Sequence, residues 1–231
     1  MKYLIPPSEG KTSENLTNIQ FKDSKYKFNE NVQIILNKLK LLKDSELVKL
    51  YGVKKEKVEH IHAINININE ALCTPAINRY SGVVFSNISY ETFNSIEREF
   101  FNEYFLIFSG LFGMVSPFTL IPNYKLKMNV LKLYKFWNSI LTIELKKENQ
   151  IIDLLPKIHK KAYTQNQDCI NIDFVIEKDG LKKPAGHFGK AIKGKFIQYI
   201  CKNQITRFED LIQFTEDGFK WDGNSFIKYN D

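Results

Sequence analysis

The chain has 231 residues, of which 43% are hydrophobic, enough for one sizeable core and too apolar for a disordered protein. Its apolar runs are too short to cross a bilayer, and its first residues lack the long apolar segment of a secretory signal peptide. Cys73, Cys169 and Cys201 are odd in number and widely spaced. This pattern favours reduced thiols in the cytoplasm over a disulfide framework.

The formal net charge of +7 is concentrated in one part of the chain. Residues 181–207 contain seven basic residues and no acidic one, whereas the remaining 26 basic residues equal the 26 acidic residues of the whole chain. A localised excess of positive charge predicts a polyanionic partner, and a lysine-rich face that only confers solubility is the simpler alternative. The seven are Lys182, Lys183, Lys190, Lys193, Lys195, Lys202 and Arg207.

In chain order, residues 2–5 predict a short strand that ends at two prolines. The polar loop that follows contains Gly-Lys-Thr, as a phosphate-binding loop does, but that motif requires a glycine where Ile5 stands. The phosphate-loop motif is therefore excluded. The loop still supplies candidates for contact with a phosphate or a carboxylate, namely Ser8, Glu9, Lys11 and Thr12.

Residues 29–50 predict a helix, because their apolar side chains keep a helical period. Residues 46–60 then resemble half of a helix-hairpin-helix, in which a turn at Gly52 would direct backbone N–H groups toward a nucleic-acid phosphate. Lys54, Lys55 and Lys57 would flank that contact. Because Lys54 replaces the second glycine of the usual hairpin, an ordinary connection between two helices is the alternative.

Residues 64–69 alternate between isoleucine and asparagine and predict a strand. A short helix that begins at residues 74–75 carries Arg79 and Tyr80, residues 83–85 predict a buried strand, and residues 91–102 predict a helix.

Residues 104–108 form a continuous apolar run that predicts a strand buried on both faces. The chain then enters a loop, from Ser109 to residue 128, that is rich in glycine and proline. Because these residues restrict or redirect the backbone, we expect a shaped loop. Such a loop either positions a site or is only a packed crossover.

The last third predicts an amphipathic helix at residues 130–147, a buried strand at 151–155 and a half-exposed strand at 170–176. A turn follows at Asp179-Gly180, then a helix from about residue 188 to 203, and a hairpin end at 218–223. Gly194, in the middle of that helix, predicts a close approach of another backbone.

Strands near 2–5, 83–85, 104–108 and 151–155 alternate with helices, which predicts an α/β sheet with parallel strands. Ligands bind beyond the carboxyl ends of such strands. We therefore expect a positively charged cleft at this edge. The polar residues that follow the strands are Ser8, Glu9, Lys11, Thr12, Ser86, Asn87, Ser109, Lys157, His159 and Lys160.

Metal and cysteine chemistry are not expected. His60 and His62 would share a face only on a strand, and no cluster of cysteines or carboxylates supplies further ligands. None of the cysteines has a histidine at an informative spacing. The sequence thus predicts neither a metal nor another cofactor.

Taken together, several segments resemble the YaaA family of bacterial peroxide-stress proteins, in the order of that family and over nearly the whole chain. The segments are LIPPSEGKT at 4–12, RYSGV at 79–83, SGLFGMVSP at 109–117, IPNYKLKM at 121–128, FW at 136–137, IDL at 152–154, KAIKG at 190–194 and GF at 218–219.

The resemblance implies one domain over residues 1–231, with a mixed α/β fold in which helices and a helix-hairpin-helix-like element flank a central, partly parallel sheet. It also implies a positively charged cleft and a cytoplasmic role in protecting DNA from peroxide, through limiting free iron and binding DNA directly. The polar positions that match the family are Lys11, Arg79, Tyr80, Ser109, Lys125, Lys190 and Lys193.

Three positions depart from the family's pattern. Ser116 and Lys125 stand where arginine is usual, and Pro156 stands where serine is usual. Because arginine recognises phosphate with a planar fork, anion binding near these positions is expected to be weaker.

Three interpretations are compatible with these residues. The first is a monomeric protein that binds double-stranded DNA without sequence preference and protects it under peroxide stress. The alternative is an enzyme acting on a nucleotide, a nucleobase or another small anion in the same cleft; a module whose lysines only confer solubility is the third possibility. The predicted DNA contacts are Gly52, Lys54, Lys55, Lys57, Lys182, Lys183, Lys190, Lys193 and Lys195, and the predicted anion-binding residues of the cleft are Ser8, Glu9, Lys11, Thr12, Arg79, Tyr80, Ser109 and Lys125.

Overall fold

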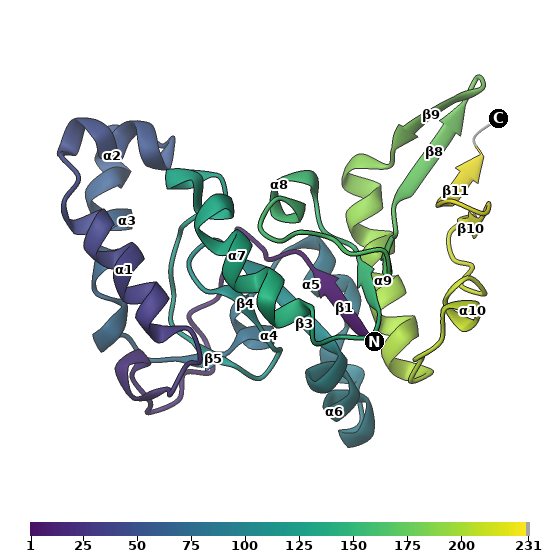
Figure 1. Cartoon of the computed structure of the whole chain (residues 1–231), viewed down its shortest axis with the longest axis horizontal. Helices are drawn as coiled ribbons and strands as arrows, with labels where there is room; N and C mark the ends of the chain where they lie inside the picture. The colour runs from purple at the N-terminus through teal and green to yellow at the C-terminus, as the bar shows by residue number, and fades with distance from the viewer. Residues whose placement is uncertain (230–231) are drawn as a thin grey trace.

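A central sheet of five strands organises the computed structural model, which describes residues 1–229 (Figure 1). Its middle strand, β1, pairs in parallel with β3 on one side and with β6 on the other. β7 extends the parallel part beyond β6, whereas β4 pairs with β3 in the antiparallel direction. The strands, in their order across the sheet, are β4 (Gly113–Val115), β3 (Phe105–Ser109), β1 (Lys2–Ile5), β6 (Ile151–Asp153) and β7 (Cys169–Asn171).

A second sheet of four strands is formed by the C-terminal part of the chain, and two short strands pair elsewhere. In the second sheet, β8 and β11 are parallel, and each has one antiparallel neighbour. Its order is β10 (Lys220–Trp221), β11 (Phe226–Tyr229), β8 (Phe174–Lys178) and β9 (Leu181–Pro184); the separate pair is β2 (Thr74–Pro75) with β5 (Leu120–Ile121).

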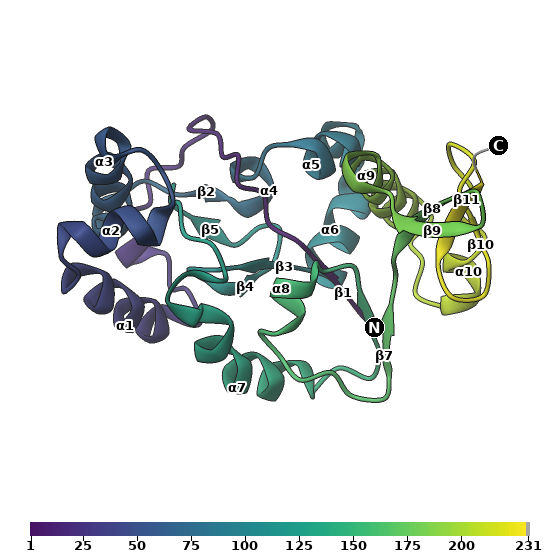
Figure 2. The same cartoon turned by 90° about the horizontal axis from the view of Figure 1, so that it is seen from above.

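The helices cover the central sheet and form the two ends of the molecule. Helices α1 to α3 lie at one end, and β8 to β11 with α9 and α10 lie at the other (Figure 1). Figure 2 shows α7 on one side of the central strands and α5 and α6 on the other. The helices are α1 (Asn29–Lys40), α2 (Asp44–Tyr51), α3 (Lys55–Ile66), α4 (Ala76–Arg79), α5 (Val83–Ile88), α6 (Ser95–Tyr104), α7 (Leu133–Leu145), α8 (Lys157–Lys160), α9 (Gly186–Lys202) and α10 (Phe208–Leu211).

One hydrophobic cluster joins both sheets, running from Tyr3 to Phe226. At its centre, the ring of Tyr3 on β1 stacks on Phe105 of β3 with ring centroids 4.7 Å apart, and its hydroxyl donates to the carbonyl of Ile205 at 2.6 Å. The prediction of a mixed α/β fold with a partly parallel central sheet is therefore confirmed, and so are the strands expected near 2–5, 104–108 and 151–155.

The strand predicted at residues 83–85 is wrong, because these residues begin helix α5. Gly82, with φ +106°, starts the helix, and the buried residues Val84, Phe85 and Ile88 lie on one face. A short apolar run has no period that separates a buried strand from a buried helix. This face packs on α9, where a Cβ on Gly194 would lie 2.4 Å from the Val84 carbonyl oxygen. The close approach predicted at Gly194 is confirmed.

The strand predicted at residues 64–69 is also wrong. Helix α3 continues to Ile66, and a 3₁₀ turn follows at Ile68–Glu70. The alternation misleads because Asn65 does not face solvent: it is fully buried, and its amide bonds to the backbone of Lys125. Its buried position is satisfied by a specific partner, which no periodic pattern reveals.

Two other predicted elements are divided in the structure. The helix expected over 29–50 breaks after Lys40, and α2 begins at Asp44, where the Glu46 carboxylate accepts from the backbone N–H of Lys43 at 2.9 Å. The strand expected over 170–176 becomes β7 in the central sheet and β8 in the second sheet. The alternation of apolar and polar residues predicts an extended conformation, but it does not predict the sheet to which a strand belongs.

Candidate functional site

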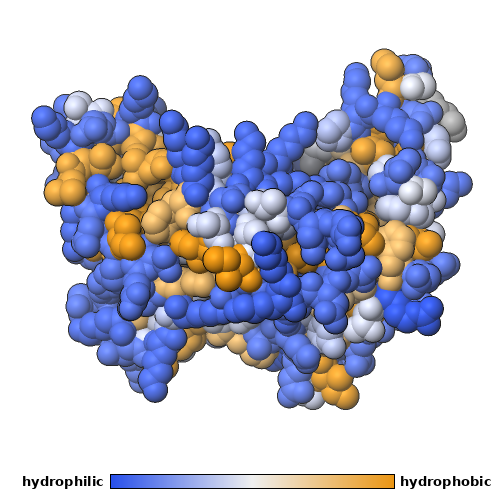
Figure 3. Space-filling view, in the orientation of Figure 1, coloured by the Kyte–Doolittle hydropathy of each residue, from blue (hydrophilic) through white to orange (hydrophobic). Residues whose placement is uncertain are grey.

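A cavity of about 930 Å³ lies beyond the carboxyl ends of β1 and β6, and we call it the main cavity. Most of its lining comes from the loop after β1, the start of α5, residues 124–129, residues 155–160 and the first turns of α9, and Gly110, residues 173–174 and residues 184–185 complete it. In Figure 3, the upper edge of the molecule is hollowed between its two ends, and hydrophilic side chains cover much of this edge. The position agrees with the rule that ligands bind where parallel strands end.

Six of the predicted site residues line the main cavity, and four of the predicted cleft residues do not. The lining includes Ser8, Glu9, Lys11, Lys125, Lys190 and Lys193, together with Lys157, His159 and Lys160 from the polar loop after β6. It does not include Thr12, Arg79, Tyr80 or Ser109, nor Ser86 and Asn87 of α5.

Lys11 enters the cavity from the loop after β1. An isolated antiparallel β-bridge joins the backbones of Lys11 and Tyr80 and fixes the loop. The N–H of Thr12 also donates a hydrogen bond of 2.9 Å to the carbonyl of Arg79. The Lys11 ammonium donates to the carbonyl of Ser8 at 3.0 Å and lies 4.2 Å from the centroid of the Tyr124 ring. The pKa of Lys11 is lowered to about 8, mainly by burial; Glu9 acts in the opposite direction, and Lys125 and Arg79 contribute to the lowering.

Beneath Lys11 lies a chain of three buried hydroxyl groups. The Tyr124 hydroxyl is 2.7 Å from that of Tyr80 and 2.8 Å from that of Ser109. Ser109 in turn accepts from the backbone N–H of Phe112 at 3.0 Å. Burial raises the pKa of Tyr124 to about 12, so this hydroxyl keeps its proton at neutral pH. Tyr80 and Ser109 therefore lie behind the cavity wall, where they hold Tyr124 in place, and do not line the cavity themselves.

Arg79 is fully buried and turned away from the cavity. Its guanidinium donates to the backbone carbonyls of Thr12, Leu72 and Ile121, the last two at 3.4 Å. Three segments distant in sequence thus meet at one side chain. The structure gives Arg79 a role in holding the loop after β1: its two terminal nitrogens are directed at carbonyls, and its buried Nε has no hydrogen-bond partner among the described residues.

Lys193 reaches the cavity from α9, on the side formed by residues 154–160. Its ammonium donates to the carbonyl of Leu154, just after β6. Burial lowers the pKa of Lys193 to about 8; Asp173 and Asp153 act in the opposite direction, and Lys160 lowers it. Asp153 itself is occupied, because its carboxylate accepts from the Tyr163 hydroxyl at 2.6 Å.

His159 lies next to this group, and sequence reasoning placed it in a polar loop without giving it a role. Burial, with Lys193 adding to the effect, lowers the pKa of His159 to about 4, so the imidazole is neutral at physiological pH. Its Nδ1 is buried and has no hydrogen-bond partner among the described residues. Tyr124 is a second residue of the cavity to which the sequence gave no role. The one indication in the sequence for His159 and Tyr124 is that each lies in a loop that follows a predicted core segment.

Lys125 is held in place by the helix-hairpin-helix-like element. The Asn65 amide of α3 donates to the carbonyl of Lys125 at 2.9 Å and accepts from its N–H at 2.7 Å. The departures from the family's pattern at Lys125 and Pro156 both lie in the lining of the main cavity, whereas that at Ser116 lies elsewhere.

The predicted DNA contacts outside the cavity lie at both ends of the molecule. Gly52 ends α2 in the left-handed conformation, with φ +58°, and its N–H donates to the Val48 carbonyl at 3.1 Å. Lys54, Lys55 and Lys57 are exposed at the start of α3. At the other end, β9 carries Lys182, paired with Asp222 at 2.7 Å, and the exposed Lys183. On α9, Lys195 pairs with Glu216 and Asp217, each at 2.8 Å.

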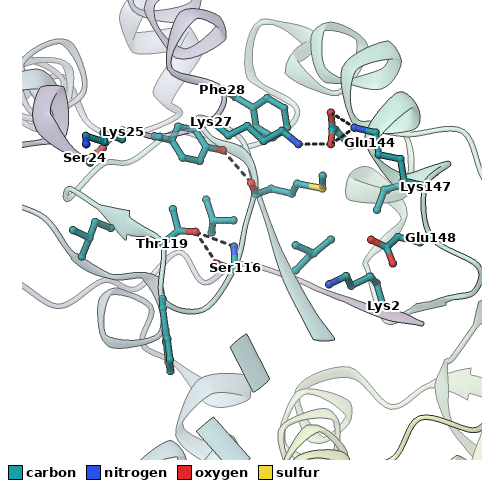
Figure 4. Close-up of a pocket in the computed structure, with 17 residues that line it drawn as sticks. Lys2, Ser24, Lys25, Lys27, Phe28, Ser116, Thr119, Glu144, Lys147 and Glu148 are labelled. Atoms are coloured by element: carbon teal, nitrogen blue, oxygen red, sulfur yellow. Dashed lines mark hydrogen bonds and ion pairs between the residues drawn. The ribbon is translucent and has the colours of Figure 1, made fainter. Parts of the chain in front are cut away.

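A second cavity, of about 520 Å³, lies beside β3 and β4 (Figure 4). Part of its charge is balanced within the protein, since Glu144 pairs with both Lys27 and Lys147. The hydroxyls of Ser116 and Thr119 also pair with each other, 2.9 Å apart. It therefore presents fewer unsatisfied groups to a ligand than the main cavity does.

Among residues 1–229, no group of three or more histidine, cysteine or acidic side chains is placed to hold a metal ion. Within the same range, no helix combines the length and the apolar character needed to cross a membrane.

Comparison with known proteins places the chain in a family. A family model described as peroxide stress protein YaaA matches residues 1–225. A UPF0246 protein of Fusobacterium nucleatum is 30% identical over 232 aligned residues, which cover 95% of this chain and 92% of the relative. A UPF0246 protein of Streptococcus gordonii is 26% identical, with 97% of this chain and 94% of the relative covered.

Several of the segments that resemble the family lie close to the main cavity. They form the loop after β1, the support of that loop at α4, the end of β3 with its following loop, and the part of α9 that reaches the main cavity. The family model extends over all of these elements. The chain therefore belongs to the peroxide stress protein YaaA family.

Proposed function

We propose that this protein binds double-stranded DNA without sequence preference and protects it during peroxide stress. The observation that carries the proposal is the distribution of exposed lysines on both sides of the hollowed edge. The hairpin of α2 and α3 carries Lys54, Lys55 and Lys57, and β9 and α9 carry Lys183 and Lys190. In Figure 1, these elements lie at opposite ends of the molecule, with the central sheet between them.

The start of α3 is suited to contact with a phosphate. The backbone turns at Gly52, and no side chain caps the first N–H groups of α3. Uncapped N–H groups at a helix N-terminus, together with the helix dipole, favour an anion, and Lys54 and Lys55 add positive charge beside them. Contacts of this kind position a duplex without reading its sequence.

Ion pairs reduce the number of lysines that are free for DNA. Lys182 and Lys195 have carboxylate partners within the protein, whereas no ion pair involves Lys183 or Lys190 in the described part of the chain. A paired lysine gives up an existing contact to bind a phosphate, so it releases less free energy on binding. The proposed duplex contact thus depends on the unpaired lysines more than on the whole basic segment.

The proposal is tested with a labelled duplex of random sequence over a series of salt concentrations. A protein that neutralises several phosphates should lose affinity steeply as salt rises, with a slope of about −0.9 per phosphate contact. Replacing Lys190 by alanine should make the slope shallower, and so should joint replacement of Lys54, Lys55 and Lys57. Affinity indifferent to salt, or strong preference for one sequence, would contradict the proposal. Gly52→Pro with unchanged affinity would remove the hairpin from it.

We further expect the protein to act in the bacterial cytoplasm, as a monomer. Its three cysteines support a reducing compartment, since all are free thiols and Cys73 and Cys201 are fully buried. Sedimentation of the full chain with and without duplex measures the oligomeric state.

A second candidate is an enzyme that acts on a nucleotide, a nucleobase or another small anion. The volume of the main cavity favours it, because about 930 Å³ lies within the range of pockets that enclose a small ligand. Two lysines with lowered pKa inside that cavity supply more chemistry than contact with a duplex backbone requires. Screening the protein against nucleotides for turnover, with Lys11→Met as control, tests this candidate.

A further inference from the structure

Two ammonium groups in the main cavity lack an anionic partner. The Lys11 ammonium contacts the Ser8 carbonyl and the face of the Tyr124 ring. The Lys193 ammonium contacts the Leu154 carbonyl. Within residues 1–229, no carboxylate lies at ion-pair distance from either lysine. A half-buried ammonium normally has a carboxylate partner, so both groups are left short of negative charge.

The carboxylates closest to the cavity do not supply that charge. Glu9 lines the cavity but pairs with Lys127 at 2.9 Å. Asp153 is occupied by the Tyr163 hydroxyl and by the backbone N–H of Leu155, each at 2.6 Å. Asp173 lines the cavity and acts on Lys193, as Asp153 does, but neither carboxylate lies at ion-pair distance from its ammonium. Against these, seven lysines line the cavity: Lys11, Lys125, Lys127, Lys157, Lys160, Lys190 and Lys193.

The lining also has an apolar part. Val83, Val84 and Phe85 of α5 face the cavity, as do Leu126 and Ile158 from the loops. A ligand that satisfies both parts must combine several negative charges with a flat or apolar body. A nucleotide has this composition, and its size suits the volume of the cavity.

We propose that the main cavity binds a mononucleotide-sized phosphate ester with two or more negative charges, for which Lys11 and Lys193 provide the counter-charges. The proposal rests on the second candidate function above and is independent of duplex binding. It names a ligand class for the cavity and assigns no bond-breaking step. The neutral His159, whose Nδ1 is unpartnered, can add a hydrogen bond to the phosphate or the base.

Binding of such an anion in the cavity should be accompanied by proton uptake, whereas attraction of an anion by exposed lysines, which are already protonated, should not. Lys11 and Lys193 both have a pKa of about 8 without a ligand, and a bound phosphate raises the pKa of a neighbouring ammonium. At pH 8, where each lysine is about half protonated, binding should therefore take up protons, up to about one per complex. The charged groups that act on Lys11 are Glu9, Lys125 and Arg79, those that act on Lys193 are Asp173, Asp153 and Lys160, and Lys193 also acts on His159.

The experiment is isothermal titration calorimetry of the full chain with adenosine monophosphate, adenosine triphosphate and adenosine at pH 8. Each titration is made in two buffers that differ in ionisation enthalpy, which gives the number of protons taken up. We expect both nucleotides to bind, the triphosphate more tightly, with proton uptake, and adenosine to bind at least tenfold more weakly. The unmodified protein alone is sufficient to decide this part.

Three variants locate the ligand. Lys11→Met and Lys193→Met, which keep the length of the buried side chain, should each weaken nucleotide binding at least tenfold and reduce proton uptake. Lys202→Met is the matched control, because Lys202 lies on the same helix as Lys193 but is exposed and does not line the cavity; it should change affinity less than about twofold. Thermal unfolding of each variant confirms that it is folded.

The proposal is overturned if millimolar nucleotide does not bind at low salt, if adenosine binds as well as its phosphates, or if binding takes up no protons. An affinity of the Lys11→Met or Lys193→Met variant equal to that of the unmodified protein would also overturn it. A parallel titration with a DNA duplex that lacks terminal phosphates separates nucleotide binding in the cavity from duplex binding. Duplex binding without nucleotide binding contradicts only this inference, and nucleotide binding without duplex binding contradicts only the DNA proposal.

Discussion

The Asn65 side chain forms two hydrogen bonds with the backbone of Lys125, donating to its carbonyl at 2.9 Å and accepting from its N–H at 2.7 Å. Asn65 is fully buried on α3, and Lys125 lines the main cavity. The helix-hairpin-helix-like element is thereby joined to the wall of the cavity. A side-chain amide that mimics a strand partner fixes a loop which has no regular structure of its own.

Replacing Asn65 by leucine should destabilise the protein by about 2–4 kcal/mol, because it removes both hydrogen bonds and leaves two buried backbone groups without partners. Urea unfolding measures the change. Asn69→Leu is a suitable comparison, since Asn69 is only half-buried and bonds to the Gln33 side chain. An equal loss of stability in the Asn65→Leu and Asn69→Leu variants would show that the hydrogen bonds with Lys125 do not stabilise the protein more than those with the Gln33 side chain.

Lys11→Met should stabilise the folded protein at pH 7 by about 1–2 kcal/mol, because the folded state bears the cost of a buried ammonium. The pKa of Lys11 is about 8 in the folded protein, against an ordinary value of 10.5. Below pH 8 both states are protonated and the cost is complete. Between pH 8 and 10.5 the folded state loses its proton first, so the cost falls as pH rises.

The stabilising effect of Lys11→Met should therefore shrink between pH 8 and pH 10. Urea unfolding of both proteins at pH 7, 9 and 10 measures it, and the difference between them cancels the titration of other groups. Lys127→Met, at an exposed and paired position, should show no such dependence. A Lys11→Met variant less stable than the unmodified protein at every pH would show that the ammonium is favourably held.

Gly194→Ala should destabilise the protein by about 1–3 kcal/mol through overpacking. The new Cβ would lie 2.4 Å from the Val84 carbonyl oxygen and 2.5 Å from the Cβ of Asn87, so α9 and α5 would have to separate. Gly189→Ala on the same helix is the control: its new Cβ would lie 3.0 Å from the Ala185 Cβ, a contact with a small side chain. Thermal unfolding of both variants should show the larger loss at Gly194.

Lys195→Ala should leave the salt dependence of DNA binding unchanged, although Lys195 belongs to the basic segment. Its ammonium pairs with Glu216 and Asp217, so its charge is already balanced within the protein. Lys190→Ala should reduce the slope by about one phosphate contact. The measurement is duplex affinity at several salt concentrations. Equal slopes for the two variants would mean that local pairing does not decide which lysines contact DNA.

Much of the fold could be predicted from the sequence, because the strands around Leu4, Ile107 and Ile152 are apolar runs bounded by turn residues. The elements that were wrong share a physical cause. Val83 to Phe85 form part of a helix because of the surface on α9 against which they pack, and Asn65 is buried because of a partner 60 residues away.

The cavity was predicted in position but not in composition. The rule for parallel strands located Lys11, His159 and Lys160 at one edge of the sheet. It could not show that Arg79 turns inward to bind backbone carbonyls, because the sequence does not reveal the direction of a side chain. Nor could it show which lysines have carboxylate partners, since Lys195 and Glu216 meet only through the packing of the C-terminal segment.

The position of β1 in the middle of the central sheet has a consequence for synthesis of the protein. Its neighbours, β3 and β6, begin at Phe105 and Ile151, so the first strand to leave the ribosome must wait for about 150 residues before both of its edges can pair. Contacts so distant in sequence slow folding, because long loops must close first. Until β3 is made, the apolar residues from Tyr3 to Ile5 have no neighbouring strand to join, and exposed apolar segments of a nascent chain are prone to aggregation.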